Sequence, residues 1–478
     1  MDTVKIDSGY ISGTVIGEPD NEVHIYRGIP YGAPPIGDLR WKPPQPVKPW
    51  AGIRECTAFS KIAPQSSTTL PGALTSTPSA NPRFIASQSE DCLYLNILTP
   101  ARNSTENLPV MVWFHGGGLR YGNGNWSLYN GPGLPQHGVV LVTVNGRLGV
   151  MGLMAHPLLS KESTKGVSGN YLFLDLIAAL QWVKKNIAAF GGDPNNVTIF
   201  GESGGGTKVI SLMASPLAKG LFHRAICESG GSTVRPLSVK EMEGFGEKLF
   251  ARLGVDKEKD PLAAARALSW EKIIEVDQAH NIEMGKEYVF MGPWNIAVDG
   301  WFMPDAPGAI FKGGKQNAVP LITLANLGEL SGTGFVVASQ MIPGYVNLLI
   351  GEGKAKVKGY AGIFDQVPGN WRQEGGVSSH AMELHYVFGE VDDPNPWKVL
   401  HFLYHSGGAK SPEPVITDAE RKVSEAMMTA WTQFAKTGDP NVKGKVTWPP
   451  YDEATDRYLY IAEPLQVKTG FSHVAQKK

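Results

Sequence analysis

The chain has 478 residues, of which 42% are apolar, 9% aromatic and 19% charged. A chain of this length buries roughly three quarters of its unfolded surface, so its core needs no metal or disulfide to hold it together. Lysine and arginine number 44, and aspartate and glutamate number 45. This balance excludes a strongly basic nucleic-acid-binding surface. No run reaches about 18 consecutive apolar residues, so we expect no membrane-spanning helix.

The N-terminus and the three cysteines bear on the cellular compartment. Residues 1–5 lack the charged and apolar regions of a signal peptide, although a chain that begins after a removed leader would look the same. Cys56, Cys92 and Cys227 are too few for a disulfide scaffold and lack the spacing of metal ligands. We therefore expect a metal-free protein that is cytoplasmic rather than secreted.

Short apolar runs alternate with helical patterns along the chain. This alternation predicts a single α/β domain over residues 1–478, with a mainly parallel sheet that helices cover on both faces. The runs that we predict as strands are Val110–Phe114, Val139–Val144, Val197–Phe200, Ala225–Cys227 and Leu321–Leu324.

Two helices have clear sequence patterns. From Leu174 to Phe190 apolar residues recur with a period close to 3.6, and the pattern ends at Gly191. Near the C-terminus a capping box that begins at Thr417 opens a second amphipathic pattern, which ends at Gly438. Between these helices we interpret residues 331–375 as a short cap or lid segment.

The sharpest chemical signal is Gly201-Glu202-Ser203-Gly204-Gly205, which has the G-x-S-x-G form of a nucleophile elbow. A predicted strand precedes it and a helical pattern follows it, as the motif requires. Small residues let the chain turn sharply enough to expose the serine hydroxyl above the sheet. We predict Ser203 as a nucleophile, with an ordinary glycine-rich turn as the alternative. Glu202 either tunes this site electrostatically or holds a neighbouring loop.

A second glycine-rich loop, His115-Gly116-Gly117-Gly118, directly follows the strand Val110–Phe114. Because glycine has no side chain, the backbone N–H groups of this loop can donate hydrogen bonds to an oxygen atom that becomes negatively charged during a reaction. We predict Gly117 and Gly118 as such oxyanion donors, joined by the N–H of Gly204. We expect His115 to orient the loop rather than to transfer protons.

A serine nucleophile needs a base, and the base needs an acid that fixes its tautomer. After an elbow of this kind the acid and then the histidine follow in the chain. His380 lies in a Gly/Ser-rich loop, whereas His385 lies in a more regular run. Glu329 follows the strand Leu321–Leu324, and Asp365 follows another apolar run. These patterns alone leave the choice of acid and base open.

Further motifs are spread nearly from end to end of the chain, at residues 26–31, 89–96, 115–118, 145–149, 190–194, 201–205 and 434–440. With these motifs the chain resembles the type-B carboxylesterases, a family that includes the cholinesterases and bacterial nitrobenzyl-type esterases, and we expect a bacterial or microbial member. In that family the acid is the glutamate of an Asn-x-x-Glu segment, which falls on Glu329. The base is the histidine shortly before Glu-x-x-x-Val-Phe-Gly, which falls on His380.

The resemblance implies an α/β-hydrolase fold with a small N-terminal antiparallel ribbon. It also implies a serine hydrolase that cleaves carboxylic esters through an acyl-enzyme, with a small-molecule ester as its partner and no cofactor. Activity should then fall as the pH drops through the pKa of His380, by default about 6–7. The alternatives are hydrolysis of a specialised ester, carbamate or amide bond, and a catalytically silent binding protein on the same fold.

Three departures from the family pattern modify these expectations. The position of the usual upstream disulfide partner is Ala63, so we expect Cys92 to stay a thiol unless it reaches Cys56. The stretch from Glu329 to His380 is short for the family, which implies a reduced helical cap and a more open site.

The third departure is the loop Asn145-Gly146-Arg147, in which glycine replaces the usual tyrosine. We expect Arg147 to form a structural ion pair with Glu90 or Asp91 rather than to bind substrate.

Overall fold

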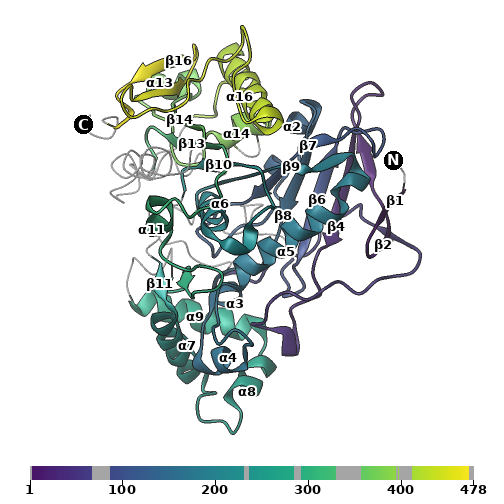
Figure 1. The fold of residues 1–478 in the computed structure, drawn as a ribbon, viewed down its shortest axis with the longest axis vertical. Helices are drawn as coiled ribbons and strands as arrows, with labels where there is room; N and C mark the ends of the chain where they lie inside the picture. Colours follow the sequence, from purple (N-terminus) through teal and green to yellow (C-terminus); the bar gives the residue numbers. More distant parts are fainter. Residues whose placement is uncertain are drawn as a thin grey trace.

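A computed structural model describes residues 3–66, 87–230, 236–284, 292–329, 357–394, 397 and 412–472. Its centre is an eleven-stranded mixed sheet with the strand order β16-β15-β14-β13-β10-β9-β7-β8-β6-β4-β3 (Figure 1). The strands from β15 to β8 in this order run parallel, and antiparallel strands extend both edges. The predicted α/β class with a mostly parallel sheet is confirmed.

The strands of the sheet, in the same order, are β16 (Gln466–Thr469), β15 (Arg457–Ile461), β14 (Gly359–Phe364), β13 (Leu321–Asn326), β10 (Arg224–Glu228), β9 (Gly192–Glu202), β7 (Leu108–Phe114), β8 (Val140–Val144), β6 (Tyr94–Thr99), β4 (Val23–Pro30) and β3 (Thr14–Ile16). All five runs predicted from the sequence coincide with strands of this sheet.

The strand β7 shows why these runs are apolar at every position. Val110, Val112 and Phe114 pack into the hydrophobic core on one face of the sheet. The intervening Met111 and Trp113 pack into the core on the other face. A strand buried on both faces has no polar alternation, which is typical of parallel sheets covered by helices.

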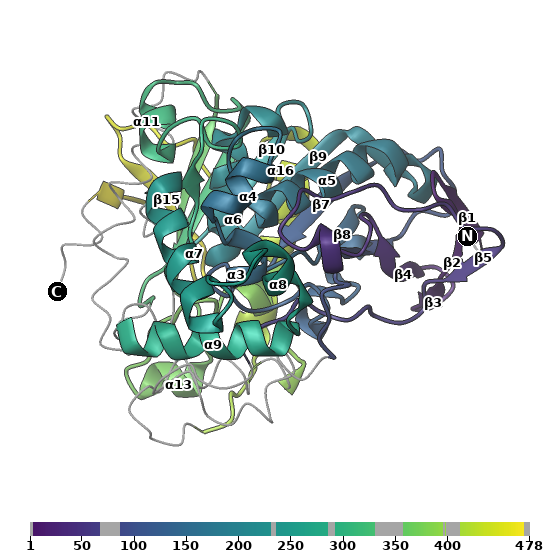
Figure 2. The same cartoon turned by 90° about the horizontal axis from the view of Figure 1, so that it is seen from below.

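Helices cover both faces of the sheet (Figure 2). On one face lie α5 (Tyr171–Asn186) and α6 (Gly204–Ala214), and on the other lie α2 (Gly133–Gln136), α14 (Leu384–Val387) and α16 (Asp418–Thr437). The first predicted helix is α5, which continues as a 3₁₀ turn to Phe190 before Gly191 adopts φ 78°. The second is α16, where the capping box at Thr417 is present and Gly438 adopts φ 79°.

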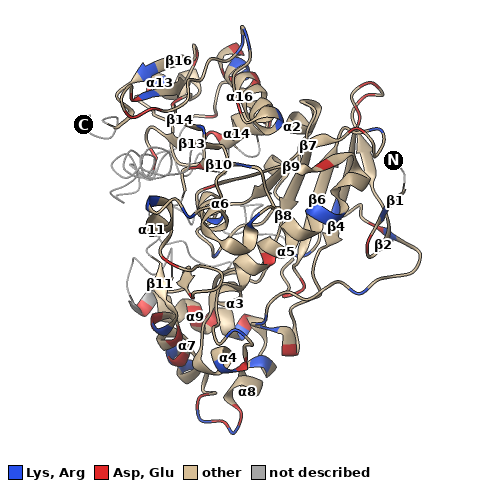
Figure 3. Ribbon diagram, viewed as in Figure 1, with Lys and Arg blue, Asp and Glu red and all other residues tan. Residues whose placement is uncertain are grey.

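The remaining helices lie beside the sheet or at one end of the molecule. They are α3 (Gly149–Leu153), α4 (Pro157–Glu162), α7 (Val239–Leu253), α8 (Pro261–Ala267), α9 (Trp270–Met284), α11 (Pro307–Lys312) and α13 (Gly369–Gln373). Charged residues gather on α4, α7, α8 and α9, while the central strands carry few (Figure 3). Within the described ranges no helix is long and apolar enough to cross a membrane.

The N-terminal segment forms a small sheet of its own. Strands β1 (Thr3–Ile6) and β2 (Gly9–Ser12) pair antiparallel, as predicted. A third strand, β5 (Ile53–Glu55), pairs parallel with β2, so the predicted ribbon is extended by a strand from a later part of the chain. A separate pair is formed by β11 (Leu237–Ser238) and β12 (Ala297–Val298).

Residues 331–356 of the predicted lid segment lie outside the described residues. Residues 357–375 of that segment contain strand β14 and the short helix α13. Strand β14 belongs to the central sheet, between β13 and β15.

Arg147 forms a buried ion pair, but the predicted partner is wrong. Its guanidinium donates to Asp175 of α5, with Nη2–Oδ1 and Nε–Oδ2 distances of 2.6 and 2.8 Å. Glu90 instead binds Arg40 at 2.6 Å. Burial of a charge is tolerated where it is paired and hydrogen-bonded, so both pairs are structural.

Candidate active site

Ser203 lies at the turn between β9 and α6, at the carboxyl end of the parallel strands. Its backbone has φ 56° and ψ −120°, a strained conformation for a residue with a side chain. Its N–H donates to the carbonyl of Glu228 at 2.9 Å, which ties the turn to the neighbouring strand β10. A Cβ atom at Gly205 would collide with the carbonyl oxygen of Phe114, so this position requires glycine.

The second glycine-rich loop follows β7, the neighbour of β9 in the sheet. Gly117 and Gly118 have φ values of 97° and 65°, which favour glycine. A Cβ atom added to Gly204 would lie 2.6 Å from the backbone nitrogen of Gly118. The structure therefore brings the backbones of the three predicted oxyanion donors together beside Ser203.

Glu329 and His380 come from loops that follow the adjacent parallel strands β13 and β14. These loops run side by side, with the N–H of His380 donating to the carbonyl of Glu329 at 3.1 Å. The imidazole Nδ1 lies 2.5 Å from Glu329 Oε2. Because an ionised carboxylate only accepts hydrogen bonds, Nδ1 carries the proton and Nε2 points away from Glu329.

The carboxylate of Glu329 is fixed from its other side. Its Oε1 accepts hydrogen bonds from the hydroxyl of Ser229 at 2.7 Å and from the backbone N–H of Asn326 at 2.8 Å. Glu329 itself has φ 37°, a second strained non-glycine residue in this site. Such a carboxylate orients a histidine ring because it cannot turn away.

The alternatives that the sequence left open lie elsewhere. Asp365 accepts a hydrogen bond from the hydroxyl of Tyr460 at 2.5 Å and forms an ion pair with Arg372 at 3.1 Å. His385 is fully buried and its ring stacks on Trp397 at 4.0 Å. Neither side chain belongs to the group that surrounds His380.

The far side of the His380 ring faces a second carboxylate. Its Nε2 lies 3.1 Å from Oε1 of Glu202, the residue before Ser203. Burial by itself lowers the pKa of His380, but the carboxylates of Glu202, Glu329 and Glu383 outweigh it and raise the pKa to about 10. Of the two roles left open for Glu202, electrostatic tuning of the site is the one that this geometry supports.

Two further buried carboxyl groups, Glu383 and Glu228, interact with Glu202, and sequence reasoning missed both. Burial and the neighbouring carboxylates raise the pKa of Glu383 well above its usual range, and raise that of Glu228 to about 8. Asn326 Nδ2 donates to Glu383 at 2.6 Å, and the indole N–H of Trp431 donates to Glu228 at 2.8 Å. Glu383 lies three residues after His380 and Glu228 lies at the end of β10, and neither local sequence indicates that the two meet.

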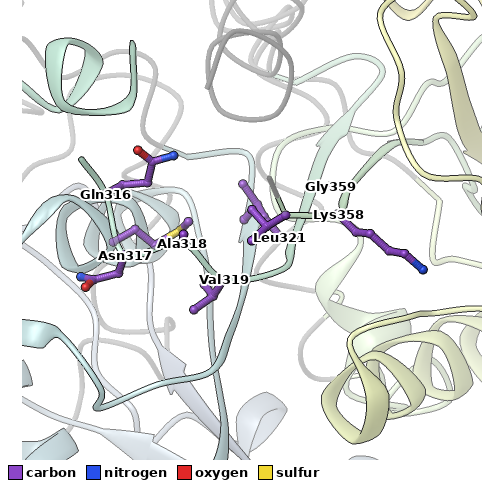
Figure 4. Close-up of a pocket in the computed structure, with 9 residues that line it drawn as sticks. Gln316, Asn317, Ala318, Val319, Leu321, Lys358 and Gly359 are labelled. Atoms are coloured by element: carbon purple, nitrogen blue, oxygen red, sulfur yellow. The ribbon is translucent and has the colours of Figure 1, made fainter. Parts of the chain in front are cut away.

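Two hollows among the described residues lie away from Ser203. One, of about 10 Å³, has room for roughly one water molecule and lies by the C-terminal part of α6 (Figure 4). Among the residues that line it are Met213, Gln316, Leu321 and Lys358. The other, of about 280 Å³, is lined by residues of the N-terminal segments, among them Arg27, Arg54, Phe59, Lys61 and Asp91.

The described residues offer no evident metal centre. No group of three or more His, Cys, Asp or Glu side chains in these ranges is arranged to hold a metal ion. Cys56, Cys92 and Cys227 are buried free thiols, so Cys92 and Cys56 do not pair.

Comparisons with known proteins show which proteins the chain is similar to. The sequence profile of the carboxylesterase family matches residues 1–342 and 335–476. The chain is similar to the para-nitrobenzyl esterase of Bacillus subtilis (strain 168), with 32% identity over 95% of this chain and 94% of that protein. It is also 33% identical to the fumonisin B1 esterase of Sphingopyxis macrogoltabida, over 92% and 84% of the two chains. A solved structure of a PNB esterase superimposes with a TM-score of 0.80 at 30% identity, covering 98% of this chain and 97% of that one.

Proposed function

Because the chain belongs to the carboxylesterase family, we propose that it hydrolyses carboxylic esters with Ser203 as nucleophile, His380 as base and Glu329 as the acid that orients the base. The observation that carries the assignment is the 2.5 Å hydrogen bond between His380 Nδ1 and Glu329, beside a strained serine elbow. This arrangement has the roles and the chain order of an α/β-hydrolase triad.

In the first half of the reaction the Ser203 hydroxyl attacks the ester carbonyl carbon and His380 Nε2 takes its proton. The carbonyl oxygen becomes an oxyanion, which the N–H groups of Gly117, Gly118 and Gly204 stabilise. The tetrahedral intermediate collapses, the C–O bond to the alcohol breaks, and His380 returns the proton to the leaving alcohol. The acyl group remains on Ser203.

In the second half a water molecule repeats these steps on the acyl-enzyme. His380 takes a proton from the water as its oxygen attacks, and the bond to Ser203 Oγ breaks as the serine regains a proton. The carboxylic acid is released and the enzyme returns to its starting state. Apart from the ester and water, these steps use only groups of the chain.

The test is a series of p-nitrophenyl esters with C2 to C12 acyl chains, with the matched p-nitroanilides as amide counterparts. We expect release of p-nitrophenol at rates far above those of the anilides, because an anilide is the poorer leaving group. The chain-length optimum reports the depth of the acyl pocket. Anilide hydrolysis as fast as ester hydrolysis would favour the amide alternative, and a folded protein inactive on every substrate would favour a binding protein.

The pH dependence of this activity should reflect the carboxylates around His380. The imidazole must be neutral to act as base, and its raised pKa means that kcat/KM should climb through the neutral and alkaline range rather than level off at about 7. Glu202→Gln removes one negative charge 3.1 Å from Nε2 and so lowers the His380 pKa. The rising limb of the plot of kcat/KM against pH should move to lower pH by about one unit or more.

The control for this shift is Glu275→Gln, which neutralises an exposed carboxylate on α9. Its pH–rate profile should overlay that of the wild type. A Glu202→Gln profile that also overlays the wild type, or moves to higher pH, would contradict the electrostatic role of Glu202.

A further inference from the structure

We propose that Lys208 is a positioning residue that holds the oxyanion loop, residues 115–118, in its catalytic geometry. This inference rests on the proposed ester hydrolysis. Lys208 lies in α6, five residues after Ser203, and only 2% of it is exposed. Its ammonium group donates to the carbonyl oxygen of His115 at 2.8 Å. His115 is the residue that leads into Gly116, Gly117 and Gly118.

The helix geometry explains why this side chain reaches the loop. Lys208 lies one turn after Gly204, so both residues occupy the same face of α6. Side chains on a helix lean toward its N-terminus, which carries the Lys208 chain back over Gly204 and Gly205. Gly205 lies against the carbonyl of Phe114 and Gly204 lies against Gly118, so this face of α6 is the one that meets the loop.

The hydrogen bond from Lys208 is one of two that fix the first carbonyl groups of the loop. His115 Nδ1 lies 2.8 Å from the carbonyl oxygen of Gly116 and must be the donor, because a carbonyl oxygen only accepts. Successive carbonyls are thus held by Lys208 and by His115. The peptide group that His115 holds carries the N–H of Gly117, and Lys208 holds the peptide group just before it. Lys208 therefore restrains the direction of the Gly117 N–H through the preceding peptide group.

A buried lysine in this position lowers the stability of the fold. Lysine is almost never fully buried unless it is paired, and no carboxylate among the described residues lies within ion-pair distance of Lys208. Burial lowers the pKa of its ammonium group to about 7. Buried Lys208 thus lowers the stability of the fold at the point where α6 meets the oxyanion loop. Stabilisation of the transition state by the loop best explains a lysine at this position.

The discriminating experiment compares Lys208→Met with wild type in kcat, KM and melting temperature. Methionine fills similar space without the charge, so the melting temperature should stay equal or rise. Removing an oxyanion donor itself costs roughly 10²–10³ in rate, and an indirect effect on the loop should lower kcat by about 10- to 100-fold. KM should stay within about threefold, because the loop acts on the transition state rather than on the bound ester.

A trifluoromethyl ketone inhibitor gives an independent readout, because Ser203 adds to its carbonyl and creates an oxyanion in the same loop. Its inhibition constant for Lys208→Met should rise in parallel with the fall in kcat. Lys240→Met, which changes an exposed lysine of α7, is the matched control and should leave all these values unchanged.

Two results would overturn the proposal. One is a Lys208→Met variant with kcat within about threefold of wild type. The other is a fall in kcat accompanied by a fall in melting temperature, which would make Lys208 a structural residue only. Ser203→Ala, measured alongside, separates this failure from failure of the proposed function: if its activity equals that of the wild type, the triad assignment itself is wrong.

Discussion

Replacing Ser203 with alanine should lower the turnover of a p-nitrophenyl ester by about 10⁶-fold, the loss found when a hydrolase of this type loses its nucleophile. The residual activity comes from substrate binding and the oxyanion donors, which the substitution leaves in place. Alanine keeps the Cβ atom that the strained turn already accommodates, so the fold and the melting temperature should be retained. The measurement is kcat on the best ester of the acyl series.

The matched control is Ser211→Ala, which removes a serine hydroxyl from α6, the helix that follows Ser203. Ser211 is buried, two turns further along α6, and its hydroxyl donates to the carbonyl of Thr207 at 2.7 Å. Its turnover should stay within a few-fold of wild type. A fluorophosphonate probe followed by intact mass should add one label to wild type and to Ser211→Ala, and none to Ser203→Ala. Turnover by Ser203→Ala above about 1% of wild type would place the nucleophile elsewhere.

The sequence was sufficient to predict the elbow and the strands around it. These elements have local signals: an apolar run that is buried on both faces, and glycines where the backbone must pass a neighbour closely, as Gly205 passes Phe114. The strand, the turn and the helix are consecutive in the sequence, so their pattern can be recognised before the fold is known.

The surroundings of His380 could not be predicted in the same way. Glu202, Glu228 and Glu383 belong to three different segments, and they meet only because β9, β10 and the loop after β14 end at the same edge of the sheet. Nothing in the local sequence indicates that these carboxyl groups share one buried space. The pKa of His380 therefore departs from the default value of a lone histidine.

The ion pair of Arg147 shows the same difference between features with a local sequence signal and contacts that only the fold determines. The predicted partners Glu90 and Asp91 do not bind Arg147. Its partner is Asp175, a single charge within the apolar pattern of α5. An isolated aspartate in such a helix is a signal for a buried ion pair, but its partner is set by which loop lies over that helix. Lys208, equally isolated in α6, is also buried, but its partner is a backbone carbonyl group of a neighbouring loop rather than an opposite charge.

Glu329→Gln should lower kcat by about 10⁴-fold, although the substitution changes only one oxygen atom to an amide nitrogen. The two hydrogen bonds to Oε1 decide the outcome. The backbone N–H of Asn326 can only donate, so the amide oxygen of glutamine must take the Oε1 position. The amide NH₂ group then faces His380 Nδ1, where Oε2 had accepted a hydrogen bond at 2.5 Å.

Because the amide NH₂ group is a donor, Nδ1 of His380 must lose its proton and act as the acceptor. The neutral imidazole then carries its proton on Nε2. An Nε2–H group cannot accept the proton of the Ser203 hydroxyl, so the base is present but in the wrong tautomer. Asp365→Asn is the matched control, because it makes the same change at the carboxylate that binds Tyr460 and Arg372, away from His380. Its kcat should stay within about tenfold of wild type, and a reversal of the two variants' effects would identify Asp365 as the acid.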